Sequence, residues 1–155
     1  MSMIDNYLAF SSSQVLTATA ASTNVIDLLN ERDIGIGKEE LTVVVYTTVA
    51  LVSAGSTTLD VKLETAPDSS GSPGSYITIA QAQQSAKADI AAAGTKICEI
   101  RIPATIPQTS ANLGRFLRLT YTVGTADFSA GAVSAYIIGA HDNVPSYPAG
   151  VIVAN

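Results

Sequence analysis

One histidine and one cysteine are the residues of this chain best suited to nucleophilic chemistry. His141 stands beside Asp142, and serines are numerous enough to complete a Ser-His-Asp triad. The sequence nevertheless has no Gly-x-Ser-x-Gly elbow that would present a nucleophilic serine. Cys98 could pair with His141 only by leaving the core in which its strand pattern places it. We therefore interpret His141 as a polar residue at a strand end and Cys98 as a core residue.

The closest carboxylate pair, Glu39 and Glu40, suits a solvated turn better than acid-base catalysis, because neighbours on a strand point to opposite faces. Residues 35–38 (Gly-Ile-Gly-Lys) lack the other elements of a phosphate-binding loop and are interpreted as a turn. Calcium loops need a regular acidic spacing that the scattered aspartates do not have. These aspartates are Asp68, Asp127 and Asp142. We therefore predict that the chain is not an enzyme, has no catalytic, cofactor-binding or metal-binding residues, and needs no cofactor.

Length and composition predict a single domain over residues 1–155 that works within an assembly. Charged residues make up only 14% of the chain, against about a quarter of an average domain. A surface rich in small Ala, Ser, Thr and Gly side chains loses little entropy when a partner covers it. The net charge of −5 and the scattered Lys and Arg residues predict no nucleic-acid partner. No apolar run approaches the roughly 18 residues of a membrane span, no signal peptide is evident, and one cysteine excludes an internal disulfide. We expect a reducing cytosol as the compartment and no membrane partner.

Short runs of β-branched and aromatic residues separated by turn residues predict an all-β domain. We expect eight strands, over residues 15–19, 24–28, 41–52, 57–65, 76–80, 96–102, 116–123 and 132–140. Residues 53–56 (Ser-Ala-Gly-Ser) are expected to join the third and fourth strands as a hairpin. A short helix is expected over residues 86–93, with Ser85 as its N-cap and Gly94 at its end. Residues 67–75 are expected to form an exposed, mobile loop.

Alternation along the strands indicates which side chains face the core. The clearest set is Leu59, Val61 and Leu63; Cys98, Ile100 and Ile102; and Leu117, Leu119, Tyr121 and Val123. The third strand is apolar on both faces, with Val43, Val45, Val49 and Leu51 on one side and Val44, Tyr46 and Val52 on the other. Two explanations stay open for this strand: an interface covers its second face, or it crosses from the core to a loop-covered edge.

The two ends of the chain are expected to be arms rather than parts of the regular sandwich. Residues 1–13 and 142–155 contain apolar and aromatic side chains without a clear period, and the second segment has two prolines, which disfavour a central strand. Each arm could pack on its own domain or reach a neighbour.

Several segments in this order resemble the capsid cement (decoration) proteins of short-tailed bacteriophages, of the Bordetella phage type. They are Thr23-Asn24-Val25-Ile26-Asp27-Leu28, residues 32–37, Ser53 to Leu59, Ile102-Pro103, residues 115–125, Phe128, Ala130-Gly131 and Tyr147-Pro148-Ala149-Gly150. The order and spacing of these segments carry the resemblance, which spans nearly the whole chain.

This resemblance implies a jelly-roll β-sandwich on the outer surface of a phage head. It also implies a homodimer that bridges neighbouring major capsid proteins. The expected function is therefore that of a structural virion protein that stabilises the expanded shell. The alternative is a carbohydrate-binding jelly-roll module of a phage or bacterial surface, for which the six tyrosines could supply contacts.

Overall fold

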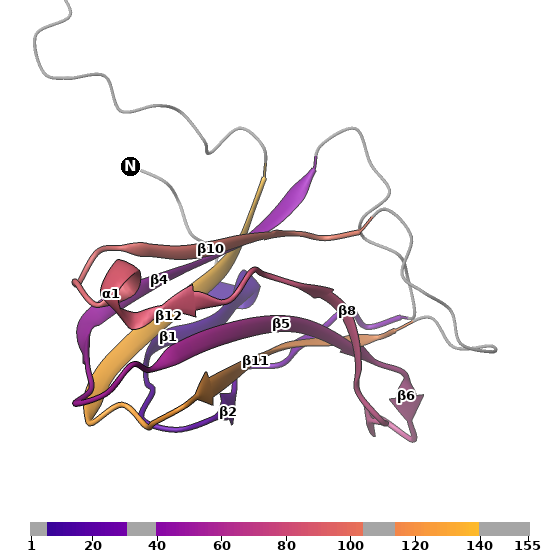
Figure 1. Ribbon diagram of the computed structural model, residues 1–155. Coiled ribbons are helices and arrows are strands. Elements are labelled where there is room, and N and C mark those ends of the chain that lie inside the picture. The colour runs from indigo at the N-terminus through magenta and orange to yellow at the C-terminus, as the bar shows by residue number, and fades with distance from the viewer. Residues whose placement is uncertain (1–5, 31–39, 104–113, 140–155) are drawn as a thin grey trace, which may run out of the picture.

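Two antiparallel β-sheets packed face to face make up the domain (Figure 1). The structure is a computed structural model, and it describes residues 6–30, 40–103 and 114–139. The prediction of an all-β sandwich is confirmed.

Sheet A lies above sheet B in Figure 1 and has the strand order β1-β12-β4-β10. Its strands are β1 (Ala9–Val15), β12 (Ala130–Gly139), β4 (Leu41–Val52) and β10 (Lys96–Arg101), and a 3-10 helix, η1 (Asn6–Leu8), precedes β1. Every pair of neighbouring strands in sheet A is antiparallel.

Sheet B follows the order β2-β11-β5-β8, with β3 beside β11 and β9 beside β5. Its strands are β2 (Ala20–Ala21), β3 (Ile26–Asp27), β11 (Phe116–Gly124), β5 (Thr58–Ala66), β8 (Ile77–Gln81) and β9 (Ser85–Ala86). A separate hairpin of β6 (Asp68–Ser69) and β7 (Ser72–Pro73) follows β5, and one helical turn, α1 (Lys87–Ile90), follows β9.

The strand order is that of a jelly roll. If β2 and β3 count as one strand and β8 and β9 as another, and the β6–β7 hairpin is left aside, the described residues form eight strands. In chain order their sheets read 1-8-3-6 and 2-7-4-5, so consecutive strands alternate between the sheets except at the fourth and fifth. This arrangement is the double-sheet jelly roll expected from the sequence.

Alternating side chains of β5 and β11 build the centre of the core, as predicted. Leu59, Val61 and Leu63 are buried from β5, and they face the same layer as Leu119 and Tyr121 of β11. Sheet A covers this layer with buried residues that include Phe10, Val43, Val45, Ile100, Val133, Ala135 and Ile137. Burying such side chains contributes about 1.5–3 kcal/mol each, and this apolar burial holds the two sheets together.

The first strand lies earlier in the chain than predicted. We expected a strand over residues 15–19 and an arm over residues 1–13, whereas Ala9–Val15 form β1 beside β12. Phe10 is fully buried, and the Ser11 hydroxyl lies 2.8 Å from that of Tyr121 in the opposite sheet. Because Ser11 donates its own proton to Gln14, the tyrosine is the donor in this second bond. Residues 9–13 therefore pack on their own domain rather than on a neighbour.

The link over residues 53–56 is also different from the predicted hairpin. It joins β4 in sheet A to β5 in sheet B, so it crosses from one layer to the other. The Ser53 and Thr57 hydroxyls lie 2.5 Å apart, and Gly55 N donates to Ser53 Oγ at 3.2 Å. The serine and glycine residues correctly indicate a turn here. They do not indicate which sheet the next strand joins, because packing decides this.

The helix is shorter than predicted and is capped differently. It covers only Lys87–Ile90, and Ala86 rather than Ser85 occupies the N-cap, without a side-chain cap bond. Gly94 has the expected left-handed conformation, with φ of +82°, but lies beyond the end of the helix.

The expected loop over residues 67–75 contains the small β6–β7 hairpin. Its two turn residues, Ser70 and Gly71, have φ of +56° and +85°, as a two-residue hairpin turn with positive φ at both positions requires.

Bulges change the facing of two strands. The pairing of β4 with β12 shifts on either side of Ala132, and Val49, predicted to face the core, is 53% exposed on the outer side. A second shift between Lys96 and Cys98 on β10 turns both Ile97 and Cys98 toward the core. One inserted residue reverses the facing of the residues that follow it, and simple alternation cannot anticipate this change.

Candidate functional site

The outer face of sheet A is apolar, and we call it the apolar face. Its members come from β1, β12 and β4: Val15, Val44, Tyr46, Val49, Val52, Tyr136 and Ile138, with the buried Ala132 between Val15 and Val49. Ala132 pairs with Val15 on one side and Val49 on the other, so these three form a row across the sheet. Val15 is 70% exposed. Apolar side chains grouped on one face of a soluble domain are typical of an interaction surface.

A tyrosine pair occupies the middle of the apolar face. The rings of Tyr46 on β4 and Tyr136 on β12 stack with centroids 5.8 Å apart. Burial, followed by the hydrogen bond to Tyr136, raises the pKa of Tyr46 to about 12. Tyr46 therefore stays neutral in the physiological range, and the two stacked rings present flat, rigid surfaces with polar tips, which suits the centre of an interface.

The position of β4 argues against one of the two explanations left open for its second face. It lies between β12 and β10, in the interior of sheet A, so the explanation by a loop-covered edge is wrong, and cover by an interface stays a prediction. Val44 and Tyr46 therefore belong to a continuous sheet surface.

Charges of both signs border the apolar face along the edge strand β10. Lys96 Nζ pairs with Glu99 at 2.8 Å, and Arg101 pairs with Glu40, which precedes β4, at 2.5 Å. The side chains of these residues are 42–74% exposed. These four charges sum to zero, and charged side chains on an edge strand oppose sheet extension by another strand.

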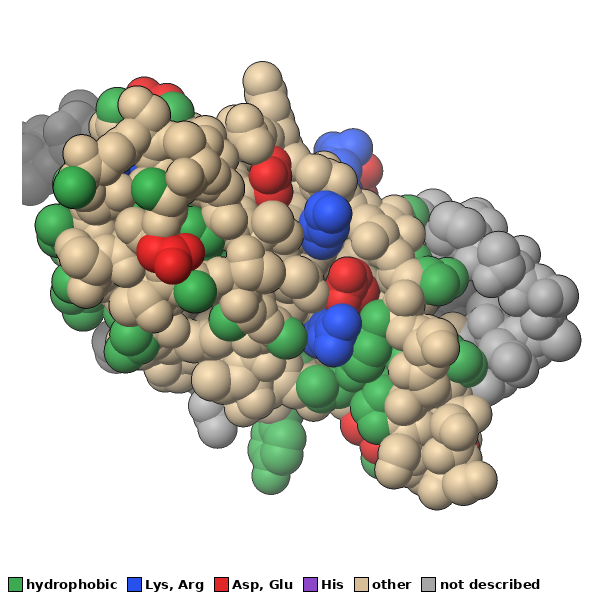
Figure 2. All heavy atoms as spheres, turned by 60° about the horizontal axis from the view of Figure 1, so that its bottom comes forward, with side chains coloured by type: hydrophobic (Ala, Val, Ile, Leu, Met, Phe, Trp, Pro, Cys, Tyr) green, Lys and Arg blue, Asp and Glu red, His purple; other side chains and the backbone are tan. Residues whose placement is uncertain are grey.

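Sheet B has a different outer face. Asp60, Lys62 and Glu64 point outward from β5, and Arg118 of β11 pairs with Glu64 at 2.7 Å. Figure 2 shows a short line of red and blue side chains across the face that it presents. Arg118 also stacks over the Tyr76 ring at 3.6 Å. The two faces of the sandwich thus differ in chemistry, one apolar and one charged.

A second arginine, Arg115, links three elements at one end of the sandwich. Arg115 binds Asp27 through two hydrogen bonds, of 2.7 and 2.8 Å, and contacts Asp68 at 3.2 Å. It thereby joins β3, the start of β11 and the β6–β7 hairpin. The hydrogen bonds from Arg115 are the main reason that the pKa of Asp27 lies below its usual value.

This pair predicts an acid-sensitive contribution to stability. Because folding lowers the pKa of Asp27, its contribution is complete above the ordinary value of 3.8 and disappears as the pH falls through the folded-state pKa. Chemical denaturation of wild type and Asp27→Asn should therefore show a stability difference that is constant above about pH 5 and shrinks as the pH falls below about 4, through the lowered folded-state pKa of Asp27. Glu99→Gln, at an exposed ion pair, is the matched control. A difference for Asp27→Asn that does not change with pH would contradict this assignment.

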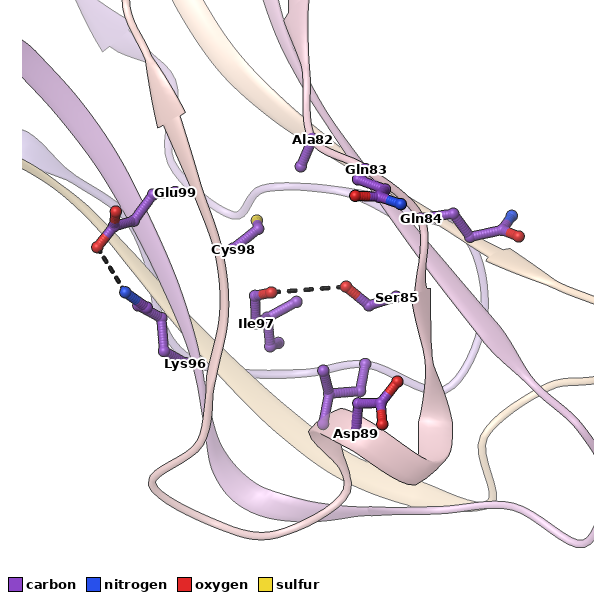
Figure 3. Close-up of a pocket in the computed structure, with 10 residues that line it drawn as sticks. Ala82, Gln83, Gln84, Ser85, Asp89, Lys96, Ile97, Cys98 and Glu99 are labelled. Carbon is purple, nitrogen blue, oxygen red and sulfur yellow. Dashed lines mark hydrogen bonds and ion pairs between the residues drawn. The ribbon is translucent and has the colours of Figure 1, made fainter.

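A groove of about 490 Å³ opens between the edges of the two sheets, bounded by β10, α1 and the segment that links β8 to β9 (Figure 3). Ser85, Ile97 and Cys98 point into it, whereas Lys96 and Glu99 pair on the far side of β10. Burial raises the pKa of the Cys98 thiol to about 12, so this thiol stays protonated at neutral pH and is not an activated nucleophile.

Of the acidic residues considered from the sequence, the structure describes Glu40, Asp68 and Asp127, and it does not bring these three together. Asp68 lies near the start of β11, in contact with Arg115, and Asp127 follows the end of the same strand. Glu40 pairs with Arg101. His141, Asp142, Glu39, residues 35–38 and the expected arm over 142–155 lie outside the described residues. The absence of enzymatic activity stays a prediction.

Sequence reasoning identified part of the apolar face and missed the rest. Val44, Tyr46 and Val52 were recognised as a second apolar face of one strand. Tyr136 and Ile138 were missed, although each alternates with a buried residue of β12. This alternation was the available signal.

The fold and its surfaces define a β-sandwich domain with one apolar outer face. The chain belongs to the Bbp16 family, a Bordetella phage protein family, which matches residues 10–137. This match extends from β1 into β12. None of the curated proteins compared with the chain matches it. No helix among the described residues is long and apolar enough to cross a membrane.

Proposed function

We propose that this chain is a structural virion protein that binds the outer surface of a phage head and cements neighbouring major capsid proteins. The observation that supports an assembly role is the exposed apolar face on a jelly-roll domain of a phage protein family, a surface suited to being covered by a protein partner. A protein that binds only the expanded shell stabilises it by mass action, and many copies on one head multiply this effect.

We further propose that the partner on the apolar face is a second copy of this chain. With a net charge of −5, two copies repel one another at most orientations. The apolar face avoids this repulsion, because its own residues are uncharged and the four charges that border it sum to zero. Two such faces can stack at the roughly 10 Å spacing of packed sheets, with the tyrosine pairs at the centre. The resulting dimer presents two identical sets of remaining surfaces, which is what bridging two capsid proteins requires.

If the chain bound carbohydrate instead, the groove beside β10 would be the candidate site for the sugar. Its lining supplies amide, hydroxyl and carboxylate groups, including Gln83, Ser85 and Asp89. Those lining residues include no aromatic ring on which a sugar could stack. The groove therefore supports this alternative less than the apolar face supports assembly.

Binding to heads tests the proposal. Purified protein should co-sediment with expanded heads that lack it, in a saturable manner at micromolar concentration. It should bind unexpanded heads more weakly, because cementing requires a preference for the expanded lattice. No co-sedimentation with expanded heads would contradict the proposal, and a saturable hit on a glycan array would then favour the carbohydrate-binding alternative.

A further inference from the structure

Leu29 is an apolar side chain held outward in an unfavourable backbone conformation. It follows β3, its side chain is 71% exposed, and its φ is +65°. Left-handed backbone is disfavoured for any residue with a Cβ atom and is adopted most readily by glycine and asparagine. A leucine at this position therefore combines local strain with exposure of an apolar group.

Two backbone N–H groups fix the turn that leads into Leu29. Leu29 N donates to Asp27 Oδ1 at 2.8 Å, and Leu28 N donates to the carbonyl of Arg115 at 2.9 Å. The Asp27 carboxylate that accepts the first bond is itself clamped by the two hydrogen bonds from Arg115. The leucine is thus carried on a turn anchored to β11. A side chain that is already positioned loses less entropy when a partner covers it.

Among the described residues, the ion-pair cluster that holds the Leu29 turn indicates the chemistry of its partner. Arg115 is paired with two carboxylates, those of Asp27 and Asp68, which leaves this cluster with a charge of −1. An apolar pocket with a cationic rim is complementary to the leucine side chain and to the net negative charge of this cluster. The turn extends from sheet B, on the opposite layer from the apolar face, so a dimer formed through the apolar face does not need it.

We propose that Leu29 is the anchor by which each copy of this chain binds the capsid shell, inserting into an apolar pocket with a basic rim on the major capsid protein. This inference rests on the proposed function and assigns its shell contact. In a dimer, two such leucines bind two capsid proteins. The left-handed turn holds each leucine side chain outward, where the capsid protein can contact it.

Three variants of Leu29 test the anchor with co-sedimentation on expanded heads that lack this protein. Leu29→Gly relieves the left-handed strain and Leu29→Asn tolerates it, so both should fold with melting temperatures at or above that of wild type. Both should weaken head binding about tenfold or more, whereas Leu29→Met should bind within about threefold of wild type. Added salt should weaken wild-type binding, because the pocket rim is cationic.

The outcomes separate this inference from the proposed function. Wild-type binding that Leu29→Gly and Leu29→Asn leave unchanged overturns the anchor alone and leaves the cement role standing. Loss of the dimer in Leu29→Gly, measured by light scattering, would assign the leucine to the copy-copy interface and also overturn it. Failure of the wild type to bind heads overturns both.

Discussion

Replacing Gly131 by alanine is expected to destabilise the fold by about 3–5 kcal/mol, through backbone strain and overpacking together. Gly131 has φ of +145°, a region that side chains rarely adopt. A Cβ atom there would lie 2.5 Å from Leu51 Cδ2 and 2.9 Å from Leu51 Cα, and Leu51 is buried. Gly131 lies in one of the two register shifts that flank Ala132, the residue that pairs with Val49 of the apolar face, so this glycine also supports the surface.

Gly55→Ala is the matched control for this prediction. Its Cβ would meet only Ala126 Cβ, at an ordinary 3.5 Å. Urea denaturation should show a change within about 1 kcal/mol for Gly55→Ala, in contrast to the large loss for Gly131→Ala. Equal effects of the two substitutions would show that the bulge at Gly131 does not have the assigned geometry.

Tyr46→Asp is expected to separate the proposed dimer into folded monomers. A carboxylate at the centre of the apolar face would lose most of its hydration on association, and in a symmetric dimer two such charges would face one another. The dissociation constant should rise about 100-fold or more, which corresponds to about 2.7 kcal/mol. Size-exclusion chromatography with light scattering across a dilution series measures this change.

Gln81→Asp adds the same charge on the outer face of sheet B, opposite Lys62, and should leave the dimer intact. Circular dichroism verifies that each variant is folded, and Tyr46→Ala provides a milder test of the same contact. A dimer that persists in both Tyr46 variants, or a wild type that is monomeric at micromolar concentration, contradicts the proposed self-association.

The parts of the fold that the sequence predicts well are strands in which burial alternates without interruption. Over residues 59–64 of β5 and 117–122 of β11, each outward residue is polar and each inward residue is apolar, so Leu63 and Leu119 were placed correctly. β1 was misplaced because its Ser-Ser-Ser run has little strand propensity of its own. It forms a strand because Phe10 enters the core and β12 supplies a partner.

The candidate site was predictable only in part, for two physical reasons. The second apolar face of β4 was visible as Val44 and Tyr46, but assigning it to a surface requires knowing that β12 and β10 flank this strand. The left-handed turn at Leu29 depends on a carboxylate that Arg115 clamps from 88 positions away in the chain. No local pattern encodes such a contact.

The stability of expanded heads as a function of bound protein tests the central claim most directly. Heads that lack this chain should be heated with increasing amounts of wild-type protein, and shell disruption followed by light scattering or DNA release. The cement role predicts that the disruption temperature rises with occupancy and levels off at saturation, with less protection from Leu29→Gly at equal total concentration. Heads that are saturated with wild-type protein yet break at an unchanged temperature would contradict it.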